Sequence, residues 1–212
     1  VADLQNKLIK TPGKAEESFS DDPLRMMRAA RFMSQLNFEI DPSVLVAIKS
    51  MATRLEIISF ERIRDEFIKI LMSPSPRIGI TVLVETGLAD YFLPEVPKLK
   101  LEIDEHHHHK DVYEHSLTVL EQAIGLESRL DGPNLTLRLA ALLHDIGKPK
   151  TKQLIAGGGV SFHHHEVVGA RMCKERMKKL RFDNHMIEDV SQLVFLHLRF
   201  HGYGSGEWTD SA

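Results

Sequence analysis

An apolar helical run that ends on an adjacent histidine and aspartate constrains this 212-residue chain more than any other feature. The run is Ala140-Ala-Leu-Leu-His-Asp-Ile-Gly-Lys148, so two polar side chains follow residues that favour burial. Holding such a pair against a core costs free energy unless something compensates the buried polarity. A divalent metal is the usual compensation, because imidazole and carboxylate together suit first-row metals. The pair therefore raises the hypothesis of a metal phosphohydrolase site.

Composition limits the classes of protein that remain. With 42% hydrophobic residues, the chain can bury one or two modest cores. Its net charge of -3 excludes a global basic field, so any RNA contact must come from a local patch. The single cysteine, Cys173, excludes an intrachain disulfide and fits a reducing cytosol. No apolar run reaches the roughly 18 residues of a membrane span and no secretory signal is present, so we expect a cytoplasmic protein.

Helix signals dominate the first half of the chain. A capping residue followed by proline, at Ser20-Asp-Asp-Pro23 and at Asp41-Pro42, predicts that a helix begins at each place. A third helix is expected after Ser59, with apolar residues at helical spacing. A fourth is expected to end at Gly87, because glycine favours the residue that closes a helix.

The same kinds of signal predict helices in the second half of the chain. Helices are expected to begin after Asp111 and Asn134, and over about residues 165–180 and 184–199. The stretch around Gly157-Gly-Gly159 is typical of a short hairpin or a loop. The sequence therefore predicts an all-α fold with at most one short β-hairpin.

The histidines form the first candidate site. There are 12 of them, at His106–His109, His115, His144, His163–His165, His185, His197 and His201. All but His185 fall near an expected helix end, or on a helix face able to reach the His144-Asp145 pair. A solvated linker is the simpler interpretation of His106–His109. For His115, which lies in an amphipathic helix ahead of the later His-Asp pair, metal ligation is the better hypothesis.

This order of residues resembles the HD domain superfamily, whose pattern is a His, then His-Asp, then further His residues and a distal Asp. The resemblance covers about residues 111–210. It implies that His115, His144 and Asp145 are metal ligands, and that His165 corresponds to the family's middle His-Glu-x-x-Gly stretch.

The distal aspartate of the HD pattern has two candidates. Asp210 is the first choice and Asp189 the alternative. The resemblance implies a divalent metal whose identity stays open among Mg, Mn, Ni and Fe. Its role would be to activate water or clamp phosphoryl oxygens.

Lys148 follows the His-Asp pair closely and has two interpretations. In a hydrolase it would hold a phosphate, which makes His144, Asp145 and Lys148 the candidate catalytic residues. Otherwise it would only complement the negative end of a helix dipole.

A second candidate site lies near the start of the chain. If Asp22 and Arg25 are on one helix, their spacing of three places them on one face. A carboxylate accepts and a guanidinium donates hydrogen bonds, so together they can imitate the Watson–Crick edge of a nucleotide. Arg28 and Arg31 would then reach phosphates. An ordinary ion pair with a charged solvent face is the alternative.

The run Asp-Asp-Pro-Leu-Arg-Met-Met-Arg-Ala-Ala-Arg-Phe32 resembles the neck motif of class II tRNA nucleotidyltransferases, the CCA-adding enzymes and related bacterial poly(A) polymerases. In that family an acidic Asp-x-x-Arg motif selects CTP and ATP, and Asp22 and Arg25 occupy its positions here. The segment from Phe60 to Leu71 is similar to the next neck motif, and Leu93-Pro-Glu-Val to the stretch before the body.

The resemblance divides the chain into a helical neck and body followed by an HD helical bundle. The expected segments are 1–19 as the end of a nucleotidyltransferase head, 20–93 as neck and body, 94–110 as a linker and 111–212 as the HD domain. The family's head carries a Gly-Ser motif and an Asp-x-Asp pair that binds two Mg ions. No Asp-x-Asp precedes residue 20, so we expect these residues to be part of a longer protein and inactive in transfer by themselves.

Two functions follow as hypotheses. The first is the nucleotide-selecting, tRNA-binding part of a tRNA nucleotidyltransferase, with tRNA, CTP and ATP as partners and no membrane contact. Basic residues from Lys148 to Arg181 would supply a local RNA-binding patch. The alternative is a metal-dependent HD phosphatase or 2′,3′-cyclic phosphodiesterase. Oligomeric state, and the choice between adding C, A, CCA or longer tails, stay open.

Overall fold

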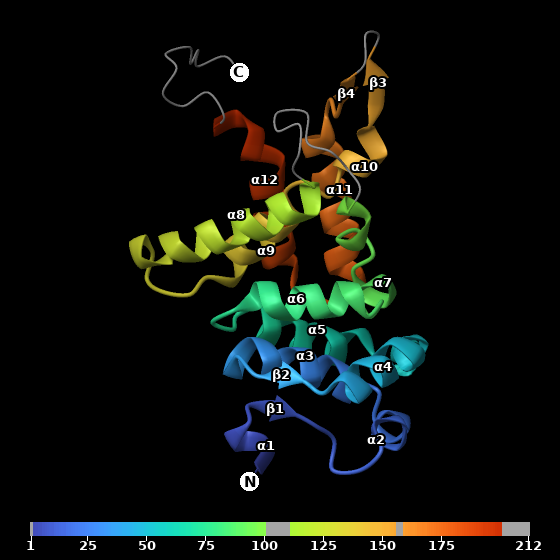
Figure 1. Cartoon of the computed structure of the whole chain (residues 1–212). Helices are drawn as coiled ribbons and strands as arrows, with labels where there is room; N and C mark the ends of the chain where they lie inside the picture. Colours follow the sequence, from blue (N-terminus) through green and yellow to red (C-terminus); the bar gives the residue numbers. More distant parts are fainter. Residues whose placement is uncertain (1, 101–110, 156–158, 201–212) are drawn as a thin grey trace.

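A computed structural model of the protein describes residues 2–100, 111–155 and 159–200 (Figure 1). The fold is all-α, as predicted from the sequence. The expected hairpin is present: β3 (Gln153–Ile155) pairs antiparallel with β4 (Gly159–Ser161). A second small sheet was not anticipated, and in it β1 (Leu8–Ile9) pairs parallel with β2 (Glu39–Ile40).

The first half of the chain forms the lower part of the molecule in Figure 1. Its elements in chain order are α1 (Ala2–Gln5), α2 (Ala15–Asp21), α3 (Leu24–Leu36), α4 (Pro42–Met51), η1 (Ala52–Ile57), α5 (Phe60–Leu71), α6 (Pro76–Glu85), α7 (Ala89–Phe92) and η2 (Pro97–Leu99). Helices α3, α5 and α6 pack on one another. Gly79 permits this, because a Cβ there would lie 2.0 Å from Oγ of Ser34 and 2.6 Å from Cγ2 of Ile70.

The second half forms the upper part. Its elements are α8 (Val112–Leu126), η3 (Glu127–Arg129), α9 (Leu135–Leu143), α10 (Lys148–Thr151), α11 (His165–Lys179), α12 (Asn184–Leu196) and η4 (His197–Phe200). Helix α9 packs against α8 and α12, and α12 packs against α11. None of the helices in the described ranges is both long enough and apolar enough to cross a membrane.

Most helices begin where the sequence predicts. The side chains of Asp41, Asp111 and Asn134 each accept a hydrogen bond from a backbone N–H in the first turn of the following helix. Gly87 has a φ of +78°, two residues after α6 ends, as expected for a glycine that closes a helix. The expected start near Ser20 is displaced: α2 runs through Asp21, and α3 begins only at Leu24.

The two halves share one continuous hydrophobic core. The expected linker contributes to it, since Val96 and Leu99 are buried, while residues 101–110 lie outside the described part of the chain.

Arg138 joins the halves by hydrogen bonds. Its guanidinium donates to both carboxylate oxygens of Glu127, each at 2.7 Å, and to the carbonyls of Leu71 at 2.8 Å and Ser73 at 3.0 Å. Arg138 and Glu127 are both buried, so the end of α5 is tied to the upper helices through a desolvated ion pair.

Arg138→Ala should therefore destabilise the protein by about 3–5 kcal/mol, because it leaves Glu127 buried and uncompensated. The free energy of unfolding in urea measures this. Arg129→Ala, at an exposed position on the adjacent turn, is the matched control and should change stability by less than about 0.5 kcal/mol. Equal losses in both variants would contradict the role given to Arg138.

The same ion pair should show in the pH dependence. Hydrogen bonds from Arg138 lower the pKa of Glu127 from its usual 4.5. A carboxylate of this kind contributes its full stabilisation above the unfolded pKa and loses it as the pH falls through the folded one. The stability gap between the wild type and Glu127→Gln should therefore be constant near neutral pH and narrow below about pH 4.5.

Candidate metal centre and nucleotide cavity

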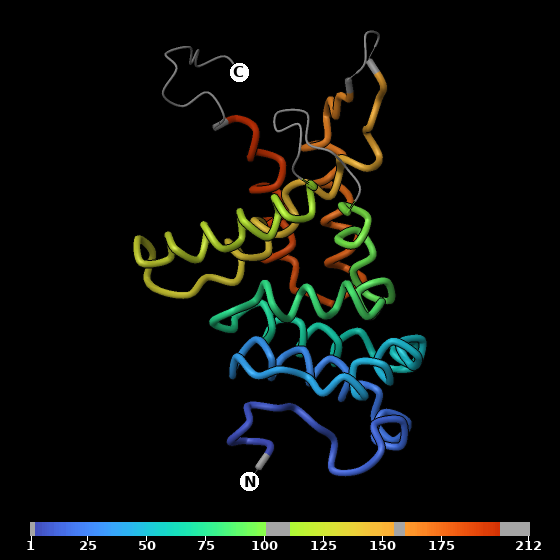
Figure 2. The backbone as a smooth tube through the Cα atoms, in the orientation of Figure 1, coloured from blue at the N-terminus to red at the C-terminus, as the bar shows by residue number. Residues whose placement is uncertain are grey.

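Four histidines and one aspartate converge where the upper helices meet. His115 lies on α8, His144 and Asp145 directly follow α9, His165 is the first residue of α11 and His197 directly follows α12. Figure 2 shows these yellow-green, orange and red segments together in the upper half. Each comes from a different part of the chain, so the centre exists only after the helices have packed.

Asp145 is the middle of this centre and is 2% exposed. Its Oδ2 lies 3.1 Å from Nε2 of His144 and 3.9 Å from Nε2 of His115. Its Oδ1 lies 3.2 Å from Nε2 of His165 and 3.7 Å from Nε2 of His197. The two oxygens of one carboxylate thus face two different pairs of imidazoles.

Backbone carbonyls fix the orientation of three of the imidazoles. Nδ1 of His144 lies 2.9 Å from the carbonyl of Ala141, and Nδ1 of His165 lies 2.8 Å from that of Phe162. Nδ1 of His197 repeats the pattern with the carbonyl three residues before it, at 2.6 Å. A carbonyl oxygen only accepts, so Nδ1 carries a proton and each ring turns its Nε2 toward Asp145. Fixing the outer nitrogen in this way is how proteins orient histidine ligands.

The electrostatics favour an ionised carboxylate at Asp145. Burial by itself raises the pKa of Asp145, but His144, His165 and Lys148 together hold it well below its usual range. Burial lowers the pKa of His197 to about 4. Oδ2 of Asp145 is fully buried, with Nζ of Lys148 at 3.0 Å and Nε2 of His144 at 3.1 Å. A buried carboxylate surrounded by imidazole nitrogens is a donor set that fits a divalent first-row cation.

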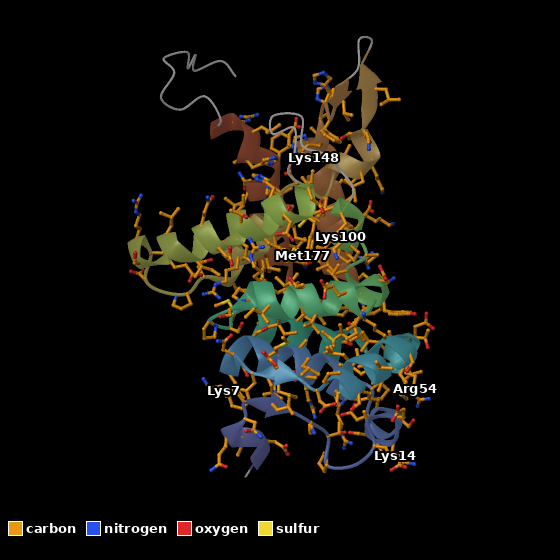
Figure 3. All side chains as sticks on the ribbon, in the orientation of Figure 1. Lys7, Lys14, Arg54, Lys100, Lys148 and Met177 are labelled. Atoms are coloured by element: carbon orange, nitrogen blue, oxygen red, sulfur yellow. The ribbon has the colours of Figure 1, made fainter. Side chains whose placement is uncertain are left out.

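Lys148 belongs to this centre. Its Nζ lies 3.0 Å from Oδ2 of Asp145, and the residue is 6% exposed. Figure 3 shows it in the upper half of the molecule. The charge of Lys148 thus lies against the carboxylate.

Two glycines allow α11 to approach the centre. A Cβ on Gly147 would lie 2.2 Å from the carbonyl oxygen of His165 and 2.7 Å from the amide nitrogen of Gly169. The backbone of Gly147 is in the ordinary right-handed helical region, with φ -76° and ψ -24°. The glycine is therefore required for space and not for conformation, and that close approach places His165 against Asp145.

Of the two candidate distal aspartates, only Asp189 is among the described residues, and it does not join the centre. Asp189 is on α12, where its carboxylate lies 2.9 Å from Nδ1 of His185, and it is not in the groups of potential metal ligands found among the described residues. Asp210 lies outside the described residues. The residue that the sequence did not single out as a ligand is His197. A signal for it existed, because His197 follows the apolar helix α12 just as His144 follows α9.

The second candidate site is a cavity of about 590 Å³ in the lower half. Arg25, Arg28 and Arg31 of α3 all line it, as their spacing of three predicts for one helix face. Glu66 of α5 lies among them, with Oε2 3.2 Å from Nη1 of Arg31. The cavity therefore presents guanidinium groups, one of which is held by a buried carboxylate.

Asp22 does not share a helical face with Arg25, which corrects the expectation from spacing. It lies in extended backbone between α2 and α3, with φ -144° and ψ 98°, because the helix starts only after Pro23. Both of its oxygens lie 3.2 Å from Nη2 of Arg62. Arg25 instead donates to the carbonyl and hydroxyl of Ser18.

The basic side chains between Lys148 and Arg181 are not all exposed, as a single RNA-binding patch would need. Lys148 is buried, and Arg176 donates to both carboxylate oxygens of Glu95 at 2.8–3.0 Å. The basic residues that are exposed are Lys150, Lys152, Arg171, Lys178, Lys179 and Arg181.

Two family models match the chain. One, described as the probable RNA and SrmB-binding site of polymerase A, matches residues 37–99. The other, the HD domain, matches residues 112–209.

Curated relatives and a solved structure agree with these matches. An A-adding tRNA nucleotidyltransferase of Deinococcus radiodurans is 34% identical over 202 residues, covering 92% of this chain and 45% of the relative. A multifunctional CCA protein of Neisseria meningitidis serogroup C is 34% identical over 191 residues, covering 88% and 44%. The chain thus spans less than half the length of these relatives. The structure of a Thermotoga maritima CCA-adding enzyme complexed with tRNA has a TM-score of 0.59 at 18% identity, covering 94% of this chain and 41% of that one, which supports the fold.

Gly147→Ala should destabilise the protein by about 1–3 kcal/mol, because its Cβ forces α11 away from the turn that carries Asp145. The free energy of unfolding in urea measures this. Gly125→Ala is the matched control: the glycine is in α8 and a Cβ there meets nothing within 4 Å. That variant should gain up to about 1 kcal/mol from helix propensity. A neutral Gly147→Ala would contradict the packing argument.

Proposed function

The chain belongs to the tRNA nucleotidyltransferase family of CCA-adding enzymes and bacterial poly(A) polymerases, and we propose that it supplies nucleotide selection and tRNA binding to such an enzyme. The observation that carries this proposal is the cavity that Arg25, Arg28 and Arg31 line together. Guanidinium groups there suit the phosphates and the base edge of a nucleoside triphosphate. Of the two relatives at 34% identity, one is named an A-adding tRNA nucleotidyltransferase and the other a multifunctional CCA protein.

In this proposal Asp22 and Arg25 read the base of CTP or ATP. Arg62 holds the carboxylate of Asp22, and Ser18 holds the guanidinium of Arg25, so each group already has a fixed partner. Reading a base would need Arg25 to exchange a contact with Ser18 for one with the nucleotide.

The transfer step itself is assigned to residues outside these 212. The sequence contains no Asp-x-Asp pair of the kind that would bind Mg for nucleotidyl transfer. The exposed basic residues of α10 and α11 are the proposed contacts with tRNA, and binding should weaken as salt rises. We propose a cytoplasmic location, because the A-adding relative is named for a reaction on tRNA.

A second function, hydrolysis of phosphate esters at the candidate metal centre, is favoured by the buried carboxylate of Asp145 and the histidines grouped around it. His115, His144 and Asp145 would hold a divalent cation, with His165 and Asp210 as the further candidates. A bound cation would polarise a phosphate and lower the pKa of a water molecule. Lys148 would hold a phosphate oxygen beside the carboxylate, which agrees with its position 3.0 Å from Oδ2.

Nucleotide binding is testable on the purified protein by saturation-transfer NMR, which detects weak complexes. ATP and CTP should give signal in preference to GTP and UTP, and Arg25→Ala should remove that preference because a base contact is lost. Lys98→Ala removes a positive charge at an exposed position away from the cavity and should leave the preference intact. An Arg25→Ala variant with unchanged preference would contradict the assignment.

Metal binding and hydrolysis are tested with His144→Ala. This variant should lose at least about 100-fold in affinity for Mn²⁺, because removal of a ligand should cost no less than removal of a residue that orients one. Hydrolysis of a 2′,3′-cyclic nucleotide by the metal-loaded protein should fall with it. His185→Ala, an exposed histidine whose ring pairs with Asp189, should change neither. A wild type that binds no metal and hydrolyses nothing would exclude the second function.

A further inference from the structure

We propose that Arg77 of α6 is a positioning residue for the candidate metal centre, because it holds α8 where His115 faces Asp145. This inference rests on the proposed metal binding of that centre and adds to it a residue of the lower half. Among the described residues, the hydrogen bonds of the Arg77 side chain go to side chains of α8 other than His115. Arg77 therefore acts on the centre through the helix that carries the ligand.

The place of His115 in the centre depends on where α8 lies. His144 and Asp145 are adjacent in the chain, which keeps these two residues together. His115 approaches from α8, and its Nε2 lies 3.9 Å from Oδ2 of Asp145, the longest of the four imidazole–carboxylate separations. Ligand atoms bound at about 2.1 Å to one cation are roughly 3.0–3.4 Å apart at octahedral or tetrahedral angles. A shift of α8 away from the carboxylate would therefore remove His115 from the ligand set.

Arg77 uses each of its three guanidinium nitrogens on a different side chain of α8. Nε donates to Glu121 at 2.8 Å, Nη1 to Glu114 at 2.8 Å and Nη2 to the hydroxyl of Thr118 at 3.1 Å. Spacings of four and three place these acceptors on one face of the helix. A planar guanidinium can satisfy all three at once, whereas the ammonium group of lysine is a compact point charge. The contact therefore fixes α8 by its geometry as well as by its charge.

A second contact joins the same two helices beside His115. Helices α6 and α8 meet where the lower half contacts the upper half (Figure 1). Tyr113 is 1% exposed, and its hydroxyl lies 3.5 Å from Oγ1 of Thr81 on α6. Thr81 and Arg77 are four residues apart, so both contacts come from one face of α6. The lower half thus holds α8 at positions 113 and 114 before His115 and at 118 and 121 after it.

The test measures the affinity of metal-free protein for Mn²⁺ by equilibrium dialysis. Arg77→Ala should weaken binding by about tenfold, the lower end of the loss caused by removing residues that orient metal ligands, because Arg77 acts through a helix. Arg77→Lys keeps the charge without the fork and should recover only part of this loss. Lys174→Ala is the matched control and should bind as the wild type, because it removes an ion pair with Glu188 between α11 and α12. Circular dichroism checks that each variant is folded.

His115→Ala and the double variant determine whether Arg77 acts through His115. His115→Ala should weaken binding, and adding Arg77→Ala should cause no further loss, since no ligand on α8 remains to be positioned. Zn²⁺ repeats the measurement, because nitrogen and oxygen sites bind it more tightly than Mn²⁺ and the weaker variants stay measurable.

The outcomes separate this inference from the function on which it rests. Wild-type affinity in Arg77→Ala, full recovery in Arg77→Lys or an equal loss with and without His115 would overturn the positioning role and leave the metal centre in place. Wild-type affinity in His115→Ala would do the same. A wild type that binds neither ion would overturn both proposals.

Discussion

The buried carboxylate of Asp145 is the constraint on which the upper half of the molecule depends. A charge that is 2% exposed costs several kcal/mol unless opposite charges or donors surround it. Here the compensation comes from Lys148 and from imidazoles at the ends of α9, α11 and α12 and on α8. Those helices must therefore meet at one point, and Gly147 allows α11 to come close enough. The arrangement of the site and the packing of these helices thus both depend on compensating the buried charge of Asp145.

The arginine-lined cavity and the candidate metal centre lie in different halves, but one hydrophobic core joins these halves. One core runs through both, and Arg138 ties the carbonyls at the end of α5 to Glu127. Helix α5 also carries Glu66, whose carboxylate contacts Arg31 in the cavity. The same helix thus contacts the cavity through a side chain and the upper half through its last turn.

Local chemistry explains which parts of the fold were predictable. Starts of helices at Asp41, Asp111 and Asn134 depend on one side chain and a nearby N–H, so sequence is sufficient for them. The β1–β2 pair joins residues about thirty apart and carries no local signal. The prediction that Asp22 and Arg25 share a helical face was wrong, because the helix begins only after Pro23. Spacing along the sequence does not show where a helix begins.

Patterns in the sequence were sufficient to predict the helical class and the family, and they singled out His115, the His144-Asp145 pair and His165 in order along the chain. Tertiary structure alone decided that His197 joins them and that Asp189 pairs with His185 instead. It also decided that Lys148 is buried against Asp145. The physical reason is that a ligand set is defined by where helix ends meet in space, and that meeting depends on packing between segments that sequence spacing does not relate.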